Sequence, residues 1–166
     1  DLRQNPRVEM LTLVMLGYVI FAAGEAVGLS GKDGGLIRAK KVIGEGDFKN
    51  IDFKNTGMVQ SIDPEVVSLL DGSPFIPVIA PIGIGDDGTT YNINADTAAG
   101  YVAEKLKAER LILLTDVVGV LDNKKKLITE LNEKKAANFI KNGTIKGGML
   151  PKIKTCFNII KKGVKG

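Results

Sequence analysis

The chain has 166 residues, of which 44% are hydrophobic and 25% are charged, a balance that predicts one folded domain with a substantial core. This composition excludes a disordered chain, and the longest apolar stretch, residues 11–23, is too short and too interrupted to span a bilayer. With a single cysteine, Cys156, and no histidine, the chain has no internal disulfide framework and is not expected to bind zinc, so a reducing compartment is expected.

The net charge of +4 is concentrated in a lysine-rich C-terminal part. Clustered lysines can bind the phosphates of nucleic acids. However, only 5% of the residues are aromatic and there is no tryptophan, so the stacking platforms of nucleic-acid binders are missing. We therefore expect no nucleic-acid partner, but a solvated basic face with a polyanionic small molecule bound at one place.

The first half of the chain contains signals for strands and for one short helix. Residues 25–42, "EAVGLSGKDGGLIRAKKV", are predicted to form a strand, a glycine-rich turn and a second strand. In "DPEVVSLLDG", Asp63 is the predicted N-cap of a helix, Pro64 its first residue and Gly72 the residue beyond its end. The run "FIPVIAPI", residues 75–82, predicts a central parallel strand that its prolines end early.

The second half continues the alternation of helices and strands. Apolar residues keep helical spacing over 94–108 and over 150–162, where Gly163 ends the second helix. Between these helices, residues 110–121, "RLILLTDVVGVL", predict a buried strand. Strands that alternate with helices predict an α/β fold with a mostly parallel sheet covered on both faces.

The stretch "YNINADTAAG" brings polar residues to a predicted helix start. Asn94 is the expected N-cap, and Asp96 lies in the first turn, where the helix dipole favours a carboxylate. Capping alone explains these two residues, but it does not explain Asn92. Alternation along an extended segment places Asn92 and Asn94 on the same side, next to a helix N-terminus, which suits a carboxylate ligand.

Two further turns could bind a nucleotide. Thr115 and Asp116 lie at the end of a predicted strand and precede Gly119. This motif is either an ordinary turn or a contact for a nucleotide's sugar or base. Gly147 and Gly148 expose backbone N–H groups before a helix that carries Lys152, an arrangement that favours an anion. The Walker pattern is absent, so phosphate would be bound by another architecture.

Four segments together, "AVGLSGKDGGLIRAKK", "IPVIAPIGIGDDGTTYNINADTAAG", "LILLTDVVGVLD" and "GTIKGGMLPKI", resemble the acetylglutamate kinases of the amino acid kinase family. The resemblance runs from about Arg3 to the C-terminus. It implies a three-layer αβα sandwich with a mainly parallel central sheet. It also implies a single domain, 1–166, with an acetylglutamate-binding half at 1–95 and an ATP-binding half at 96–166.

The resemblance further implies transfer of the ATP γ-phosphoryl group to the side-chain carboxylate of N-acetyl-L-glutamate, in arginine biosynthesis. By the family's motifs, Lys152 contacts the transferred group and Asp96 orders the catalytic lysines. Asn92, with Asn94, binds acetylglutamate, and Arg3 grips its carboxylate. The resemblance implies nucleotide contacts at Thr115, Asp116, Val117, Val118, Gly119, Val120, Leu121, Thr144, Ile145, Lys146, Gly148 and Met149. Magnesium is expected on the ATP phosphates, with no metal site built by the protein.

Departures from the family pattern leave alternatives open. The family's first strand, with a second catalytic lysine, would precede Asp1, and its last strand and helix would follow Gly166, so we expect the domain to be incomplete at both ends. Lys54 and Met58 stand where the family commonly has glycine and glutamate. Another amino acid kinase, acting on aspartate, glutamate or a nucleoside monophosphate, or a catalytically impaired nucleotide-binding fragment, are the alternatives. The resemblance also implies a homo-oligomer and a possible PII signalling partner. From the composition we expect no membrane association, and abundant lysine, isoleucine and asparagine fit a cytoplasmic or plastid stromal location.

Overall fold

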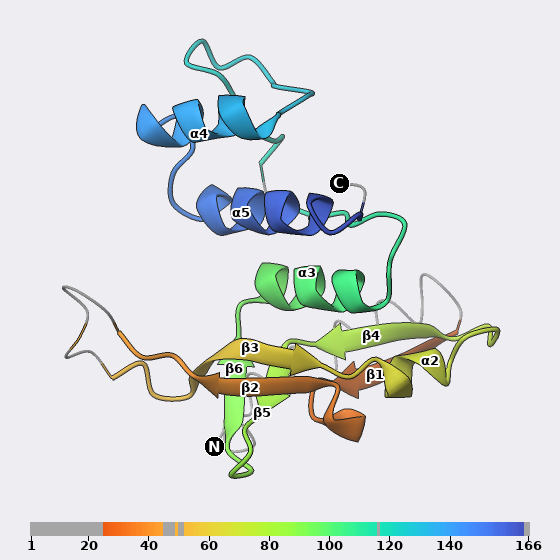
Figure 1. Ribbon diagram of the computed structural model, residues 1–166. Coiled ribbons are helices and arrows are strands. Elements are labelled where there is room, and N and C mark those ends of the chain that lie inside the picture. The colour runs from red at the N-terminus through yellow and green to blue at the C-terminus, as the bar shows by residue number, and fades with distance from the viewer. Residues whose placement is uncertain (1–24, 45–48, 50–51, 116, 165–166) are drawn as a thin grey trace. The chain divides into compact units, whose positions relative to one another are not determined.

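The computed structural model describes residues 25–44, 49, 52–115 and 117–164 (Figure 1). The chain divides into two compact units, Asp1–Ala98 and Ala99–Gly166. The first unit holds the strands, and the second is built from helices and loops. Strands with parallel pairing and helices together confirm the mixed α/β class that the sequence predicts. The proposed division of function at 95/96 stays a prediction.

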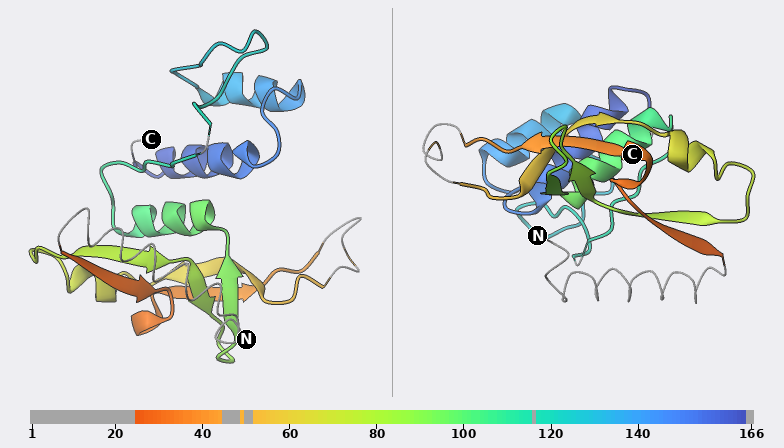
Figure 2. Two further views of the ribbon diagram at one scale, coloured as in Figure 1. Left: turned by 180° about the vertical axis from the view of Figure 1, so that it is seen from behind. Right: turned by 90° about the horizontal axis from the view of Figure 1, so that it is seen from below.

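Two strands of the first unit pair in parallel, with β1, Ala26–Ser30, beside β4, Ile76–Ala80 (Figure 2). Their register runs from Ala26 opposite Ile76 to Ser30 opposite Ala80. The prediction of a parallel strand over 75–82 is confirmed, and β4 ends directly before Pro81. Among the described residues this sheet has two strands, so the central position predicted for β4 is not seen there.

The other strands of the first unit close into a small barrel in the order β2-β3-β6-β5. Neighbouring strands alternate between antiparallel pairs, β2 with β3 and β5 with β6, and parallel pairs, β3 with β6 and β2 with β5. Sequence reasoning predicted β2 but not the barrel, whose strands are β2, Ile37–Lys41, β3, Thr56–Ile62, β5, Ile82–Ile84, and β6, Thr90–Ile93.

Two glycines let the barrel strands approach closely. A Cβ atom added at Gly57 would lie 2.5 Å from Cβ of Tyr91, and one added at Gly83 would lie 2.7 Å from Cβ of Ala39. The interior is therefore filled by Ala39, Tyr91 and Ile93, which are all buried. A larger residue at either glycine would overpack this narrow core.

The predicted helix over 63–72 forms, but it is shorter. Helix α2 spans Glu65–Ser68, and its N-cap is Pro64 rather than the predicted Asp63. Oδ1 of Asp63, one residue earlier, accepts a hydrogen bond from the N–H of Glu65 at 3.1 Å. Turns continue to Gly72, whose φ of +77° belongs to the left-handed region that glycine adopts readily. A short 3-10 turn, η2, Asp33–Gly35, links β1 to β2 and confirms the predicted glycine-rich turn.

Three longer helices follow. Helix α3, Ala95–Lys105, begins in the first unit and continues in the second, and α5, Met149–Ile160, ends before Gly163, as the spacing predicts. Helix α4, Glu133–Lys141, was not predicted. Its signals are Asn132, which accepts from the N–H of Lys135 at 2.9 Å, and Gly143, with a φ of +76°.

The strand predicted over 110–121 is wrong. In the described part of this segment the backbone forms no strand. Arg110 and Leu121 each make only an isolated bridge, and that of Leu121 is antiparallel to Leu127. Ile112 is 70% exposed and Leu114 is 86% exposed. An apolar run becomes a buried strand only beside a pairing strand, and the described residues of the second unit supply none. No described helix is long and apolar enough to cross a membrane.

Candidate functional site

The asparagines of "YNINAD" lie at the end of β6 and the start of α3. Tyr91 and Ile93 are buried inside the barrel, whereas Asn92 and Asn94 are exposed. Because side chains alternate along a strand, this burial pattern places both asparagines on the outer face. The structure thus brings these two predicted substrate-binding residues to one side of the strand.

Asn94 caps helix α3. Its Oδ1 accepts hydrogen bonds from the N–H of Thr97 at 3.0 Å and from Oγ1 of the same residue at 3.2 Å. Asp96 lies half-buried in the first turn, where the helix dipole stabilises a carboxylate. The predicted cap is confirmed, and capping uses the carbonyl oxygen of the Asn94 amide rather than its NH2 group.

Neighbouring strands fix the backbone of Asn92 from two sides. Its N–H donates to the carbonyl of Asn55 at 2.7 Å, and it stands opposite Thr56 of β3 and Ile82 of β5. A strand that is paired on both sides holds the Cα and Cβ atoms of its residues in fixed positions, which suits a residue that orients a ligand.

The glycine-rich turn after β1 carries a lysine that sequence reasoning did not select. Nζ of Lys32 donates to Oγ1 of Thr90 at 3.1 Å in a partly buried position. Asp33 holds the turn, because its Oδ2 accepts from the N–H of Ser30 at 2.6 Å and from the Ser30 hydroxyl at 3.0 Å. The available signal was a lysine in a turn at the carboxyl end of a parallel strand.

In the second unit, the turn before α5 presents open backbone. Gly147 has a φ of +56°, and a Cβ added at Gly147 or Gly148 would meet no described atom within 4 Å. Lys152 lies in the first half of α5, and its Nζ donates to the carbonyl of Leu114 at 3.3 Å. The structure therefore brings Lys152 to the residue that precedes Thr115, where the segment of predicted nucleotide contacts begins.

A second link joins the nucleotide segments. Oγ1 of Thr144 donates to Oδ1 of Asn123 at 2.5 Å, which ties the loop before α5 to the turn after Leu121. Lys146 is exposed and Met149 is half-buried, whereas Ile145 is 2% exposed, so its side chain belongs to the core of this unit.

The remaining predicted nucleotide residues belong to residues 115–121, which precede the turn that contains Asn123. Val117 is 52% exposed and Val118 is 79% exposed, and Gly119 has a φ of +134°. Val120 and Leu121 are half-buried. Arg3 and Asp116 lie outside the described residues.

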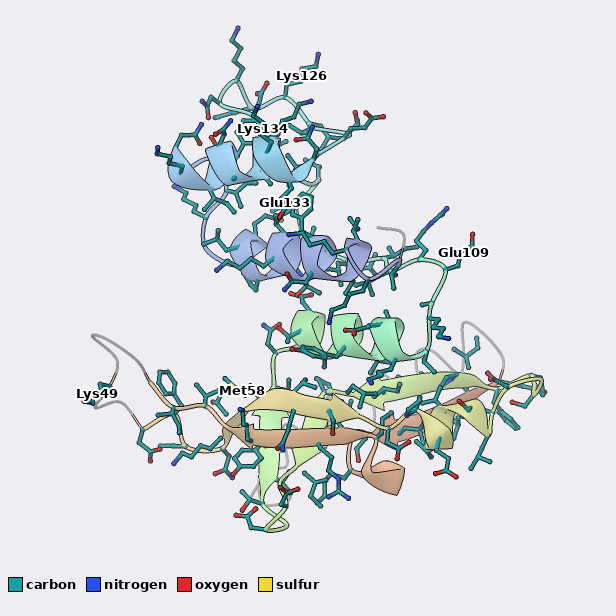
Figure 3. The ribbon with its side chains drawn as sticks, viewed as in Figure 1. Lys49, Met58, Glu109, Lys126, Glu133 and Lys134 are labelled. Carbon is teal, nitrogen blue, oxygen red and sulfur yellow. The ribbon has the colours of Figure 1, made fainter. Side chains whose placement is uncertain are left out.

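Charged side chains crowd the second unit. Figure 3 shows Lys126 on the loop before α4, and Glu133 and Lys134 on the helix itself. Glu133 pairs with Lys161 at 2.5 Å.

In the first unit, Lys49 is exposed. Met58 of β3 is 42% exposed, so the glutamate that the family commonly has at position 58 would be tolerated.

Polar residues at strand ends, a capped helix start and a lysine-bearing helix with an open glycine turn are features of α/β proteins, whose ligand sites form at the carboxyl ends of strands. The family model of the amino acid kinase family matches residues 7–166. The chain therefore belongs to the amino acid kinase family.

Curated relatives support a narrower similarity. The chain is 51% identical over 145 residues to an acetylglutamate kinase of Nitrosomonas eutropha, covering 86% of this chain and 49% of the relative. It is 47% identical over 172 residues to an acetylglutamate kinase of Gluconobacter oxydans, covering 95% of this chain and 58% of the relative. The chain thus spans about half the length of the curated relatives it matches.

Solved structures share the fold. The structure of smu.665 from Streptococcus mutans matches with a TM-score of 0.71 and 29% identity, over 84% of this chain and 54% of that one. N-acetylglutamate synthase from Neisseria gonorrhoeae matches with a TM-score of 0.68 and 20% identity, over 84% of this chain and 31% of that one. The second likeness concerns the fold alone.

Proposed function

We propose that the complete gene product transfers the γ-phosphoryl group of ATP to the side-chain carboxylate of N-acetyl-L-glutamate, a step of arginine biosynthesis. The observation that carries this proposal is the 51% identity to an acetylglutamate kinase over 86% of this chain. The placement of the predicted polar residues at strand and helix ends supports it.

The acceptor is held by the first unit. Asn92 and Asn94 present side-chain amides on one face beside the N-terminus of α3, whose dipole favours negative charge. Amides donate hydrogen bonds to a carboxylate without adding charge. This arrangement orients the diacid so that one oxygen of its side-chain carboxylate can attack the γ-phosphorus. Arg3 adds a charged contact in the proposed site.

The phosphoryl group is handled by the second unit. The carboxylate oxygen forms a bond to the γ-phosphorus, and the bond from that phosphorus to the β–γ bridging oxygen breaks, which leaves ADP and an acyl phosphate. Both reactants are anions, so the protein must mainly neutralise charge and align them. Lys152 supplies a positive charge and the start of α5 supplies N–H dipoles. The family resemblance implies that Asp96, a residue of the first unit, orders the catalytic lysines.

Nucleotide binding uses the loops that the structure links through Thr144 and Asn123, together with the segment from Thr115 to Leu121. The described residues contain no group of three or more His, Cys, Asp or Glu side chains that could hold a metal ion. Magnesium would be carried by the ATP phosphates in this proposal, where it would screen their charge.

The test is an assay of the complete gene product for ADP release with several acceptors: N-acetylglutamate, glutamate, aspartate and nucleoside monophosphates. Hydroxylamine traps an acyl phosphate as a hydroxamate, so ADP and hydroxamate should form in equal amounts with N-acetylglutamate. Preference for another acceptor would make the protein a different amino acid kinase. Nucleotide binding without turnover would indicate an impaired nucleotide-binding protein.

The resemblance to acetylglutamate kinases also supports three finer proposals: a homo-oligomer, a possible complex with a PII signalling protein, and a location in the cytosol or the plastid stroma. Sedimentation of the complete gene product, with and without a PII protein, tests the first two. Fractionation of the source cells tests the third.

A further inference from the structure

We propose that Lys32 is a further substrate-binding residue, whose ammonium group pairs with a carboxylate of the acylated diacid held by Asn92. This inference rests on the proposed function and adds a residue to its acceptor site. It begins from the charge of Lys32. The partner that the structure gives this partly buried ammonium is a neutral hydroxyl, that of Thr90, at 3.1 Å.

A partly buried cation is stabilised by an anion far more than by a hydroxyl. Ion pairs among the described residues include those of Lys41, Lys161 and Lys162, and none of these three pairs includes Lys32. Asp33, its neighbour in sequence, uses one carboxylate oxygen to hold Ser30. The charge of Lys32 is therefore available for a ligand.

The direction of Lys32 matters as much as its charge. Thr90 and Asn92 are two residues apart on β6, and the buried Tyr91 between them points into the barrel. Thr90 and Asn92 therefore share the outer face, about 7 Å apart along the strand. A carboxylate between them would be within hydrogen-bond reach, about 2.9 Å, of both the Lys32 ammonium and the Asn92 amide.

The face beside these polar groups is apolar. Ile82 stands opposite Asn92, Ile84 stands opposite Thr90, and both are half-buried. Residues directly opposite on paired strands point to the same side, so this face combines one cation, one amide and two aliphatic side chains. That combination fits a carboxylate joined to methylene or acyl groups.

The turn fixes the position of the Lys32 backbone. A Cβ added at Gly31 would lie 2.6 Å from Cγ1 of Ile37, so the backbone of the turn packs closely against the Ile37 side chain. The N–H of Gly31 donates to the carbonyl of Ala80 at 3.2 Å, and the N–H of Gly35 donates to the carbonyl of Lys32 at 3.0 Å. Only the long side chain needs to reorient from Thr90 to a ligand.

A cation at this position also gives specificity. Glutamate with a free amino group carries an ammonium beside its α-carboxylate, and Lys32 would repel it. Acylation removes that charge, so Lys32 favours the acylated acid over the free one. Removal of the Lys32 charge should therefore change substrate preference as well as affinity.

The experiment compares Lys32→Met, Lys32→Arg and Thr90→Val with the wild type, using the complete gene product. Lys32→Met should raise the KM for N-acetylglutamate at least tenfold while leaving the KM for ATP within twofold, and Lys32→Arg should recover most of the loss. The ratio of kcat/KM for N-acetylglutamate to that for glutamate should fall in Lys32→Met. The matched control is Lys40→Met, because Lys40 is an exposed lysine of β2.

Thr90→Val tests whether Lys32 contacts the ligand or only supports the structure through its hydrogen bond to Thr90. It removes the hydroxyl but keeps the charge, so it should change the KM for N-acetylglutamate by less than threefold. Equal effects of Thr90→Val and Lys32→Met, or an unchanged KM in Lys32→Met, would overturn the inference and leave the proposed function intact. If the wild type does not turn over N-acetylglutamate, calorimetry with that acid decides: binding that is lost in Lys32→Met supports the inference, and absence of binding to the wild type overturns it together with the proposed function.

Discussion

Gly100 of α3 lies directly against Thr155 of α5, so closely that a Cβ added at Gly100 would be 2.5 Å from Cγ2 of Thr155 and 3.3 Å from Cγ2 of Ile159. Thr155 and Ile159 are both buried, and a β-branched threonine has little freedom to move its methyl group. The glycine thus sets how closely the two helices pack in the second unit.

Gly100→Ala should therefore destabilise the protein, although alanine is the better helix former. Overpacking costs about 1–3 kcal/mol, whereas the gain in helix propensity is about 1 kcal/mol. Urea unfolding followed by circular dichroism measures the net change. The double variant Gly100→Ala with Thr155→Ser removes the clashing methyl and should recover stability; if it does not, close packing is not the cause.

Lys54 has a φ of +51° in the turn that leads into β3, a left-handed conformation that is costly for any residue with a Cβ. Lys54→Gly should therefore raise the free energy of unfolding by about 0.5–1 kcal/mol, after the greater freedom of glycine in the unfolded chain is subtracted. Thermal unfolding checks the sign. The control, Lys40→Gly in β2, should instead destabilise, since glycine weakens a strand interior.

Asn92→Ala should raise the KM for N-acetylglutamate and leave the KM for ATP unchanged, because the amide lies on the outer face of β6 and the barrel core is untouched. Steady-state kinetics with each substrate varied in turn measure both constants. Gln60→Ala on the neighbouring β3 is the control, as it removes another exposed amide. An unaltered KM for the acid would exclude Asn92 from the acceptor site.

Lys152→Ala should lower kcat by roughly a hundredfold to a thousandfold, with a smaller change in ATP affinity. A charge directed at the transferred group acts mainly in the transition state, so it affects kcat more than binding. Lys154→Ala, two residues along α5 and exposed, is the matched control. Equal losses in kcat and in ATP affinity would show that Lys152 only binds the nucleotide.

Local signals predicted much of this structure. The cap at Asn94, the helix end at Gly163 and the parallel pairing of β4 depend on nearby residues or on a buried apolar run, and each is confirmed. Lys54 shows the limit of such reading: its departure from glycine was visible in the sequence, but the strained φ was not.

Features that depend on distant partners were missed. The barrel needs Gly57 and Gly83 to meet Tyr91 and Ala39 across different strands, and no local pattern reports such an approach. The predicted strand over 110–121 failed for the same reason, since its apolar residues specify burial but not a partner. Lys32 was overlooked because its bond to Thr90 joins residues 58 positions apart.

The C-terminal turn of the second unit is fastened at several points. Nζ of Lys162 binds Glu104 at 2.5 Å and lies 5.6 Å from the centre of the Tyr101 ring, and Val164 packs with Ala103 and Ile159. Loss of the residues from Lys162 onward would therefore loosen α3 from α5, because the ion pair, the ring contact and the Val164 packing would all be lost together.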